Sequence, residues 1–99
     1  MKDILQGLDK AFESKARLGI MSVLMVNDWV EFTEMKELLG LSDGNVASHI
    51  QSLEKLGYVH VRKEFRGKKP VTSYAATVPG KKAFENHLNA LEKLINSDH

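Results

Sequence analysis

The stretch that decides the fold is LSDGNVASHIQSLEKLGYVHVRKEFRGKKP, residues 41–70. Ser42 can cap a helix, and the apolar residues that follow it recur at steps of three and four until Gly57. After Gly57 the spacing changes to two, which is typical of a half-buried strand. The stretch therefore predicts a helix over residues 43–56, a strand, a basic turn and a second strand.

The helix predicted for residues 43–56 has two dissimilar faces. Val46, Ile50 and Leu53 share one side, which we expect to be buried. The opposite side carries short polar side chains, which can approach base edges and hydrogen bond to them, but no arginine for guanine. A helix that merely faces solvent looks similar, and its place after a helix and a turn favours a role in DNA binding. The candidate readout residues are Asn45, Ser48, His49, Gln51 and Ser52.

Two strands follow this helix and predict a hairpin. Val59, Val61 and Phe65 share one face of the first strand, which we expect to be its buried face. Residues 66–70, RGKKP, interrupt the spacing, and residues 71–76 return as the partner strand. The expected hairpin therefore carries a basic tip at residues 66–70.

Charge is distributed unevenly along the chain, although the net charge is only +1. Residues 28–43 carry five acids and one lysine, a net of −4, whereas residues 62–69 carry five basic side chains and one acid, a net of +4. Lysine and arginine on a hairpin tip can follow phosphates without reading sequence, and lysines at a sheet edge also serve solubility. The candidate phosphate contacts are Lys63, Arg66, Lys68 and Lys69.

The residues before this stretch predict three helices and one short strand. Apolar residues recur at helical spacing in each helix, and Asn27-Asp28 reads as a turn before the strand. Gly40 ends the third helix at a position where a positive φ costs glycine nothing. The expected elements are a helix over 1–13, an apolar helix over 16–26 capped by Ser14, a strand at 29–32 that pairs with the hairpin, and a helix over 34–39 capped by Thr33.

A long amphipathic helix closes the chain, from its cap at Thr77 to about Asn96. Its apolar residues recur at steps of four and three, the seam spacing of helices that pack along their length. Together with the first helix it offers more apolar surface than one small core needs. The two ends either fold back on the domain or join two chains, and we expect a two-fold dimer. The expected interface residues are Leu5, Leu8, Phe12, Phe84, Leu88, Leu91 and Ile95.

No pattern in the sequence predicts a catalytic or metal site. The chain has no cysteine, which excludes disulfides and thiolate ligands. Ser48 and His49 are adjacent on a helix and diverge by about 100°, so they cannot act as nucleophile and base. The histidines, His49, His60, His87 and His99, lack the spacing of a zinc site. We expect no enzyme activity, no metal and no cofactor.

Length and composition are those of one small globular domain. The chain has 99 residues, of which 42% are hydrophobic and 27% charged. No apolar run approaches the ~18 residues of a membrane span. The first residues, MKDILQ, lack the basic-then-apolar pattern of a signal peptide. We expect a cytoplasmic protein without a membrane partner.

Four segments in order resemble the small, stand-alone winged helix-turn-helix transcriptional regulators related to the MarR and ArsR groups. They are KARLGIMSVL (15–24), FTEMKELLGLSDGNVASHIQSLEKLGYV (32–59), FRGKKPVTSYAAT (65–77) and PGKKAFENHLNALEKL (79–94). The resemblance covers nearly the whole chain. It implies a mainly α fold with a small β-hairpin (α+β), with a winged helix core over 14–77 between dimerisation segments at 1–13 and 78–99.

The resemblance also implies how the chain would bind its partner. The helix over 43–56 would enter the major groove, the basic tip at 66–70 would lie on phosphates, and the chain would act as a homodimer. SHI at residues 48–50 is similar to a step in ArsR recognition helices, which favours His49 as a DNA contact. The absence of cysteine speaks against a metal effector, and a small-molecule effector remains an open question.

These observations predict a sequence-specific regulator that binds double-stranded DNA as a homodimer, with its two recognition helices ~34 Å apart. The alternative is a winged helix that binds another protein through its hairpin and terminal helices and binds no DNA. Salt-dependent binding to duplex DNA distinguishes the two.

Overall fold

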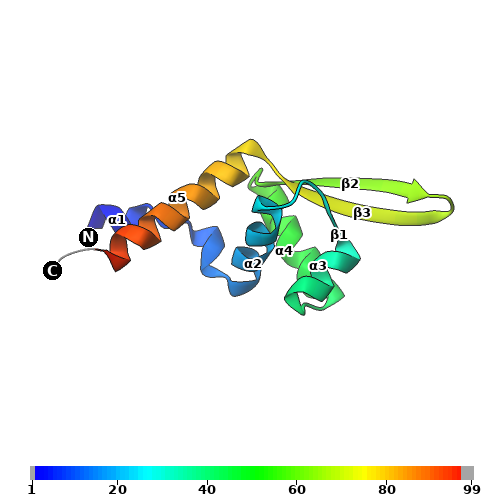
Figure 1. The fold of residues 1–99 in the computed structure, drawn as a ribbon, viewed down its shortest axis with the longest axis horizontal. Coiled ribbons are helices and arrows are strands. Elements are labelled where there is room, and N and C mark those ends of the chain that lie inside the picture. The colour runs from blue at the N-terminus through cyan, green and yellow to red at the C-terminus, as the bar shows by residue number, and fades with distance from the viewer. Residues whose placement is uncertain (1, 97–99) are drawn as a thin grey trace.

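The computed structural model describes residues 2–96, in which the helices lie at one end of a small antiparallel sheet whose hairpin projects away from them (Figure 1). The expected fold class, mainly α with a β-hairpin, is confirmed. The elements are α1 (Lys2–Gln6), the 3-10 helix η1 (Lys10–Glu13), α2 (Lys15–Met25), β1 (Val30–Glu31), α3 (Phe32–Leu39), α4 (Asp43–Lys55), β2 (Val59–Arg66), β3 (Lys69–Ala76) and α5 (Val78–Ile95).

Side-chain caps begin three of the helices as the sequence predicted. The hydroxyls of Ser14, Ser42 and Thr77 accept hydrogen bonds from backbone amides in the first turns of α2, α4 and α5. Gly40 has a φ of 63° at the end of α3, also as expected. The expected cap at Thr33 is wrong, because α3 already begins at Phe32 and no side chain caps it.

The predicted continuous helix over residues 1–13 is wrong, because the chain turns between α1 and η1. A Cβ placed on Gly7 would lie 3.2 Å from the Cβ of Ala90, so the chain passes close to α5 at this glycine. Asp9 then caps η1, since its carboxylate accepts a 2.9 Å hydrogen bond from the amide of Ala11. The close approach to α5 at Gly7 and the cap at Asp9 together divide residues 1–13 into two separate helices, α1 and η1.

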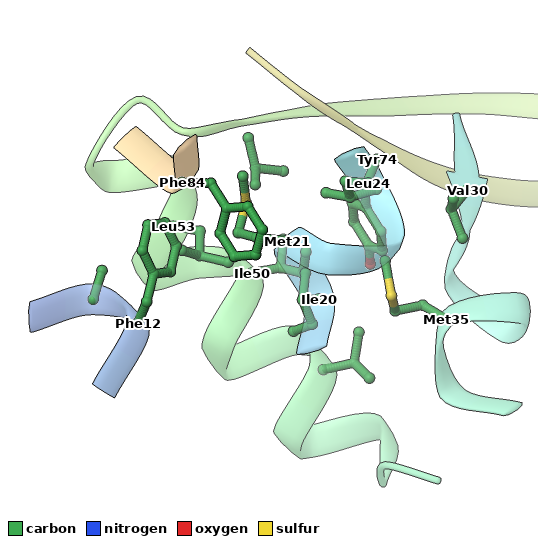
Figure 2. Packing of buried hydrophobic residues seen from close by; sticks show 13 residues of the cluster. Phe12, Ile20, Met21, Leu24, Val30, Met35, Ile50, Leu53, Tyr74 and Phe84 are labelled. Atoms are coloured by element: carbon green, nitrogen blue, oxygen red, sulfur yellow. The ribbon is translucent and has the colours of Figure 1, made fainter. Parts of the chain in front are cut away.

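The core is built around α2, whose Ile20, Met21 and Leu24 are fully buried. Figure 2 shows these three side chains in the middle of the cluster, between Phe12 and Phe84 on one side and Val30 and Met35 on the other. The expected inner face of α4 is confirmed, because Val46, Ile50 and Leu53 all lie in this cluster. The outer face of α4 is thereby left to solvent.

Phe12 and Phe84 were expected at a dimer interface, and both predictions are wrong. Only 3% of Phe12 and 4% of Phe84 is exposed, and their rings meet edge to face with centroids 5.2 Å apart. The two phenylalanines therefore close one end of the core within a single chain. Helical spacing had identified the apolar face but not the surface that covers it.

The sheet has the strand order β1-β3-β2, with both pairs antiparallel. The short strand β1 pairs with β3 as expected, Val30 opposite Tyr74 and Glu31 opposite Ser73. Strands β2 and β3 form an eight-residue ladder from Val59 opposite Ala76 to Arg66 opposite Lys69. We call this hairpin, residues 59–76, the wing; Figure 1 shows it extending beyond α3, in the opposite direction to α5.

Two details of the wing differ from the sequence-based expectation. The turn is Gly67-Lys68 rather than residues 66–70, because both strands continue closer to the tip. Gly67 has a φ of 68°, as the first position of a type II′ turn requires. Phe65 was expected to be buried, yet 75% of it is exposed, because the wing extends farther than the core it covers.

Candidate nucleic-acid interface

The outward face of α4 is a row of short polar side chains. Asn45, Ser48 and Gln51 are exposed, and His49 and Ser52 are half-buried at its margins. Ser42 fixes the start of the helix by accepting a hydrogen bond from the amide of Asn45. Amide and hydroxyl groups held on a capped helix can donate to and accept from base edges. The structure thus brings all five candidate readout residues to one face of α4.

His49 is held by a residue that the sequence had not singled out. A guanidinium nitrogen of Arg17 lies 3.5 Å from Nδ1 of His49, and Arg17 Nε donates a 2.7 Å hydrogen bond to the carbonyl of Ala11. Arg17 therefore links η1, α2 and α4. The contact between Arg17 and His49 had no sequence signal, because the two residues lie far apart in the chain.

A shallow groove runs beside the carboxyl-terminal half of α4. Ser52 and Lys55 of α4 line it together with Lys10 and Arg17 from the amino-terminal part of the chain. Its three cations come from η1, α2 and α4, so sequence reasoning did not identify them as one group. Asp9 also lines the groove, so its three cations and one acid give it a net formal charge of +2.

The cations of the wing divide into free and paired groups. Lys63, Lys68 and Lys69 are exposed, and within residues 2–96 no acid lies within ion-pair distance of them. Arg66 differs, because its guanidinium lies 3.2 Å from the carboxylate of Glu31. Three of the four expected phosphate contacts are therefore unpaired, and the fourth is paired with Glu31 of β1, on the far side of β3.

One face of the wing carries Arg62 and Glu64 of β2 and Ser73 of β3, and side chains that reach across β3 cover it; we call it the outer face. The guanidinium carbon of Arg62 lies 4.0 Å from the centre of the Trp29 ring, a cation–π geometry, and Arg62 Nε is 3.4 Å from Glu64. Ser73, which lies opposite Arg62 in β3, is only 3% exposed. Trp29 and Arg62 thus pack against each other at the base of the wing. Composition alone did not predict this contact.

Asp9, Tyr58 and His87 form a hydrogen-bonded cluster that is at least partly buried. The Asp9 carboxylate accepts a 2.7 Å hydrogen bond from the Tyr58 hydroxyl, which, with partial burial, raises the pKa of Tyr58 to about 12. The amide of Asp9 donates to His87 Nδ1. Among the described residues no group of three or more His, Asp or Glu side chains could hold a metal ion. His99 lies outside these residues.

The apolar residues of the terminal helices are covered to different degrees. α1 packs on α5 of the same chain, as the close approach at Gly7 indicates. Leu5, Leu88 and Ile95 nevertheless remain exposed, Ile95 to 81%, while Leu8 and Leu91 are half-buried. No helix within residues 2–96 has both the length and the apolar character needed to cross a bilayer.

Comparison with known proteins places this architecture among characterised folds. A family model described as a winged helix DNA-binding domain matches residues 16–95. The chain is also 33% identical over 85 residues to the protein MJ0432 of Methanocaldococcus jannaschii, an alignment that covers 86% of this chain and 92% of that protein. The family match extends from α2 to the end of α5.

Solved structures share the same arrangement. A transcriptional regulator homologue from Pyrococcus horikoshii superposes with a TM-score of 0.84 at 29% identity, covering 96% of this chain and 92% of that one. The MepR protein of S. aureus, solved in complex with DNA, has a TM-score of 0.73 at 12% identity and covers 97% and 82% of the two chains. At that identity the second likeness concerns the fold alone.

Proposed function

This chain belongs to the winged helix DNA-binding domain family, and we propose that it regulates transcription as a homodimer that reads a short inverted repeat in duplex DNA. The observation that carries the proposal is the combination of a polar, solvent-facing α4 with three unpaired lysines on the adjacent wing. Neither surface is needed to cover the core. Both match the two tasks of a DNA-binding module, base readout and phosphate contact.

We assign base readout to α4 in the major groove. Asn45 and Gln51 can each make two hydrogen bonds to an adenine edge, and Ser48 can donate to or accept from several bases. His49 and Ser52 lie at the margins of the same face. The burial of Val46 and Leu53 holds the helix on the core, so these side chains are presented on a rigid element.

We assign phosphate contact to the wing. Lys63, Lys68 and Lys69 supply charge without a competing acid, and each phosphate that they neutralise makes the slope of log affinity against log salt steeper by ~0.9. Arg66 offers less unpaired positive charge in the free protein, since its guanidinium is paired with the carboxylate of Glu31. The wing would thereby fix the orientation of α4 on the duplex rather than read its sequence.

We assign dimerisation to the terminal segments, residues 1–13 and 78–99, which flank a winged helix core over residues 14–77. The exposed apolar residues on these segments would be covered by the same residues of a second copy, as a two-fold axis requires. Leu5, Leu8, Leu88, Leu91 and Ile95 form this surface. The activity is binding rather than catalysis, in the cytoplasm with the DNA, and it needs no cofactor.

A fluorescence-anisotropy titration of a labelled random-sequence duplex at several salt concentrations tests DNA binding. The parent should bind at low salt, and the Lys68→Ala, Lys69→Ala double variant should bind more weakly and with a shallower salt slope. The matched control is Lys81→Ala, Lys82→Ala, which removes the same charge from the start of α5. If the parent does not bind at low salt, the chain is instead a protein-interaction module.

Light scattering tests the dimer. The parent should have the mass of two chains, and the Leu88→Ser, Ile95→Ser double variant should shift towards one chain. The control is Val26→Ser, Leu38→Ser, which removes two exposed apolar side chains from outside the terminal segments. A parent of single-chain mass at all concentrations rejects the homodimer but not DNA binding by the monomer.

A further inference from the structure

Arg17 connects the amino-terminal part of the chain with the outward face of α4. Its Nε donates a 2.7 Å hydrogen bond to the carbonyl oxygen of Ala11 in η1. A terminal guanidinium nitrogen of the same side chain lies 3.5 Å from Nδ1 of His49. Both contacts are partly buried, and α2 packs directly on α4 (Figure 1). The bond to Ala11 therefore orients the guanidinium, and another of its nitrogens is directed at His49.

This contact determines which nitrogen of His49 carries the proton. A guanidinium donates hydrogen bonds and cannot accept them, so Nδ1 of His49 must accept and carries no proton. In a neutral imidazole the proton then lies on Nε2, which makes Nε2 a donor. Nε2 makes no hydrogen bond within residues 2–96, and His49 is only half-buried. The fold thus leaves an N–H group at the margin of the polar face of α4.

A fixed donor distinguishes His49 from its neighbours on the outward face of α4. The amides of Asn45 and Gln51 each contain both a donor and an acceptor, and the hydroxyl of Ser48 rotates. These side chains can adapt to either kind of group on a base edge. A neutral His49 held by Arg17 can only donate through Nε2, so its base preference follows from the fold.

Base edges in the major groove differ in how well they suit such a donor. Guanine offers two neighbouring acceptors, N7 and O6. The N7 acceptor of adenine lies beside an amino donor, the O4 acceptor of thymine lies beside a methyl group, and cytosine offers only a donor. An N–H group at His49 therefore favours guanine. α4 contains no arginine, which is the commonest guanine contact, to fill this role.

We propose that Arg17 is a positioning residue for base readout: it holds His49 as the Nε2–H tautomer, and Nε2 of His49 donates to a guanine edge in the major groove. This inference rests on the proposed function and adds the direction of one hydrogen bond and the residue that sets it. Arg17 acts through His49 and does not touch the base. Because its guanidinium is also bonded to Ala11, a segment outside α3 and α4 contributes to the readout.

The tautomer can be measured in the free protein. In nitrogen NMR of the imidazole rings at mildly alkaline pH, Nδ1 of His49 should be unprotonated and Nε2 protonated. Arg17→Lys keeps the charge, but a single ammonium cannot make both contacts, so the tautomers should exchange and the two resonances should move towards each other. His87, whose Nδ1 accepts from the amide of Asp9, is the internal reference and should not change. Identical His49 resonances in the parent and in Arg17→Lys would overturn the proposal.

Base preference is measured on duplexes that the parent selects from a random-sequence pool. Guanines are replaced one at a time by 7-deazaguanine, which lacks the N7 acceptor. Binding by the parent should weaken about three- to tenfold at one position, where His49→Ala should show no sensitivity and Arg17→Lys should lose most of it. Ser14→Ala removes the cap of α2 but keeps the guanidinium, so it should lower stability without changing this preference.

His49→Gln separates positioning from folding. A glutamine amide can both donate and accept, so this variant should accept adenine as well as guanine at that position, and adding Arg17→Lys should cause no further change. If Arg17→Lys weakens binding to every duplex equally in both backgrounds, Arg17 is only structural, and the inference is rejected while the proposed function stands. If the parent binds no duplex, the proposed function fails and the guanine contact fails with it, whereas the NMR result still decides whether Arg17 sets the tautomer.

Discussion

The backbone amide of Asp9 donates a 2.9 Å hydrogen bond to Nδ1 of His87, 78 residues farther along the chain. His87 is only 5% exposed, and its ring meets that of Phe12 edge to face at 5.4 Å. Since Nδ1 accepts, the ring carries no proton there. This one side chain therefore satisfies the amide that precedes η1 and fixes η1 against α5.

His87→Ala should destabilise the protein by about 1–3 kcal/mol through the loss of an acceptor for the Asp9 amide, with a further cost for the cavity. Urea unfolding followed by circular dichroism measures the change. His60→Ala is the control, because His60 is exposed on β2 and should shift the free energy of unfolding by about 0.5 kcal/mol or less. Equal effects of the two substitutions would mean that His87 does not tie η1 to α5.

Tyr58 should make stability fall at alkaline pH. Its hydrogen bond to the Asp9 carboxylate raises its pKa from 10.0 in an unfolded chain to about 12. The raised pKa means that the stabilisation is complete below pH 10 and is lost as pH rises through about 12. Tyr58→Phe should be less stable than the parent near neutral pH, and the difference should shrink over this range.

The free energy of unfolding measured against pH for both proteins tests this expectation. Burial also raises the pKa of Tyr74, but that residue is present in both proteins, so its effect cancels in the difference. A difference between parent and Tyr58→Phe that stays constant from neutral pH to pH 12 would show that Asp9 does not hold the phenol proton.

Gly80 allows the start of α5 to approach the start of β2. A Cβ at this position would overlap the carbonyl oxygen of Tyr58, which also accepts a hydrogen bond from the amide of Thr77. Gly80→Ala should therefore cost about 1–3 kcal/mol, because backbone must move. Gly44→Ala, in α4 with nothing within 4 Å, should be neutral or stabilising by up to about 1 kcal/mol. Thermal unfolding of the two variants compares them.

Capping rules predicted where helices begin, whereas helical periodicity did not predict what covers the apolar residues of the terminal segments. Three helices are capped by hydrogen bonds to an amide only three residues along the chain, at Ser14, Ser42 and Thr77. Such local contacts can be predicted from the sequence alone. Phe12 and Phe84 needed more than periodicity, because spacing shows which residues share a face but not which part of the fold covers them. Only the contact between the two rings, made by the folded chain, assigns them to the core.

The candidate DNA-binding site, too, could be predicted from the sequence only in part. The outward face of α4 follows from helical geometry once Val46 and Leu53 are recognised as buried. The pairing of Arg66 with Glu31 does not follow, since it depends on β1 joining the sheet beside β3. The exposure of Phe65 was missed because strand alternation gives the face of a residue and not the distance to which the core extends.

Glu31→Gln should strengthen DNA binding. Glu31 lies 3.2 Å from Arg66, and both side chains are on the surface, at 37% and 69% exposure, so the pair contributes about 0–1 kcal/mol to folding. Its removal frees one cation on the wing and deletes one negative charge near the duplex. Affinity should rise at low salt, the salt slope should steepen by up to ~0.9, and the gain should vanish at high salt.

Anisotropy titrations at several salt concentrations compare Glu31→Gln with Glu85→Gln, which makes the same change of charge on the exposed surface of α5. A gain confined to Glu31→Gln means that Arg66 reaches phosphate once it is released. Because Arg66 is then the group that acts, adding Arg66→Ala to Glu31→Gln should abolish most of the gain. If both glutamine variants bind as the parent does at every salt concentration, Arg66 faces away from DNA, and Lys63, Lys68 and Lys69 alone supply the phosphate contacts of the wing.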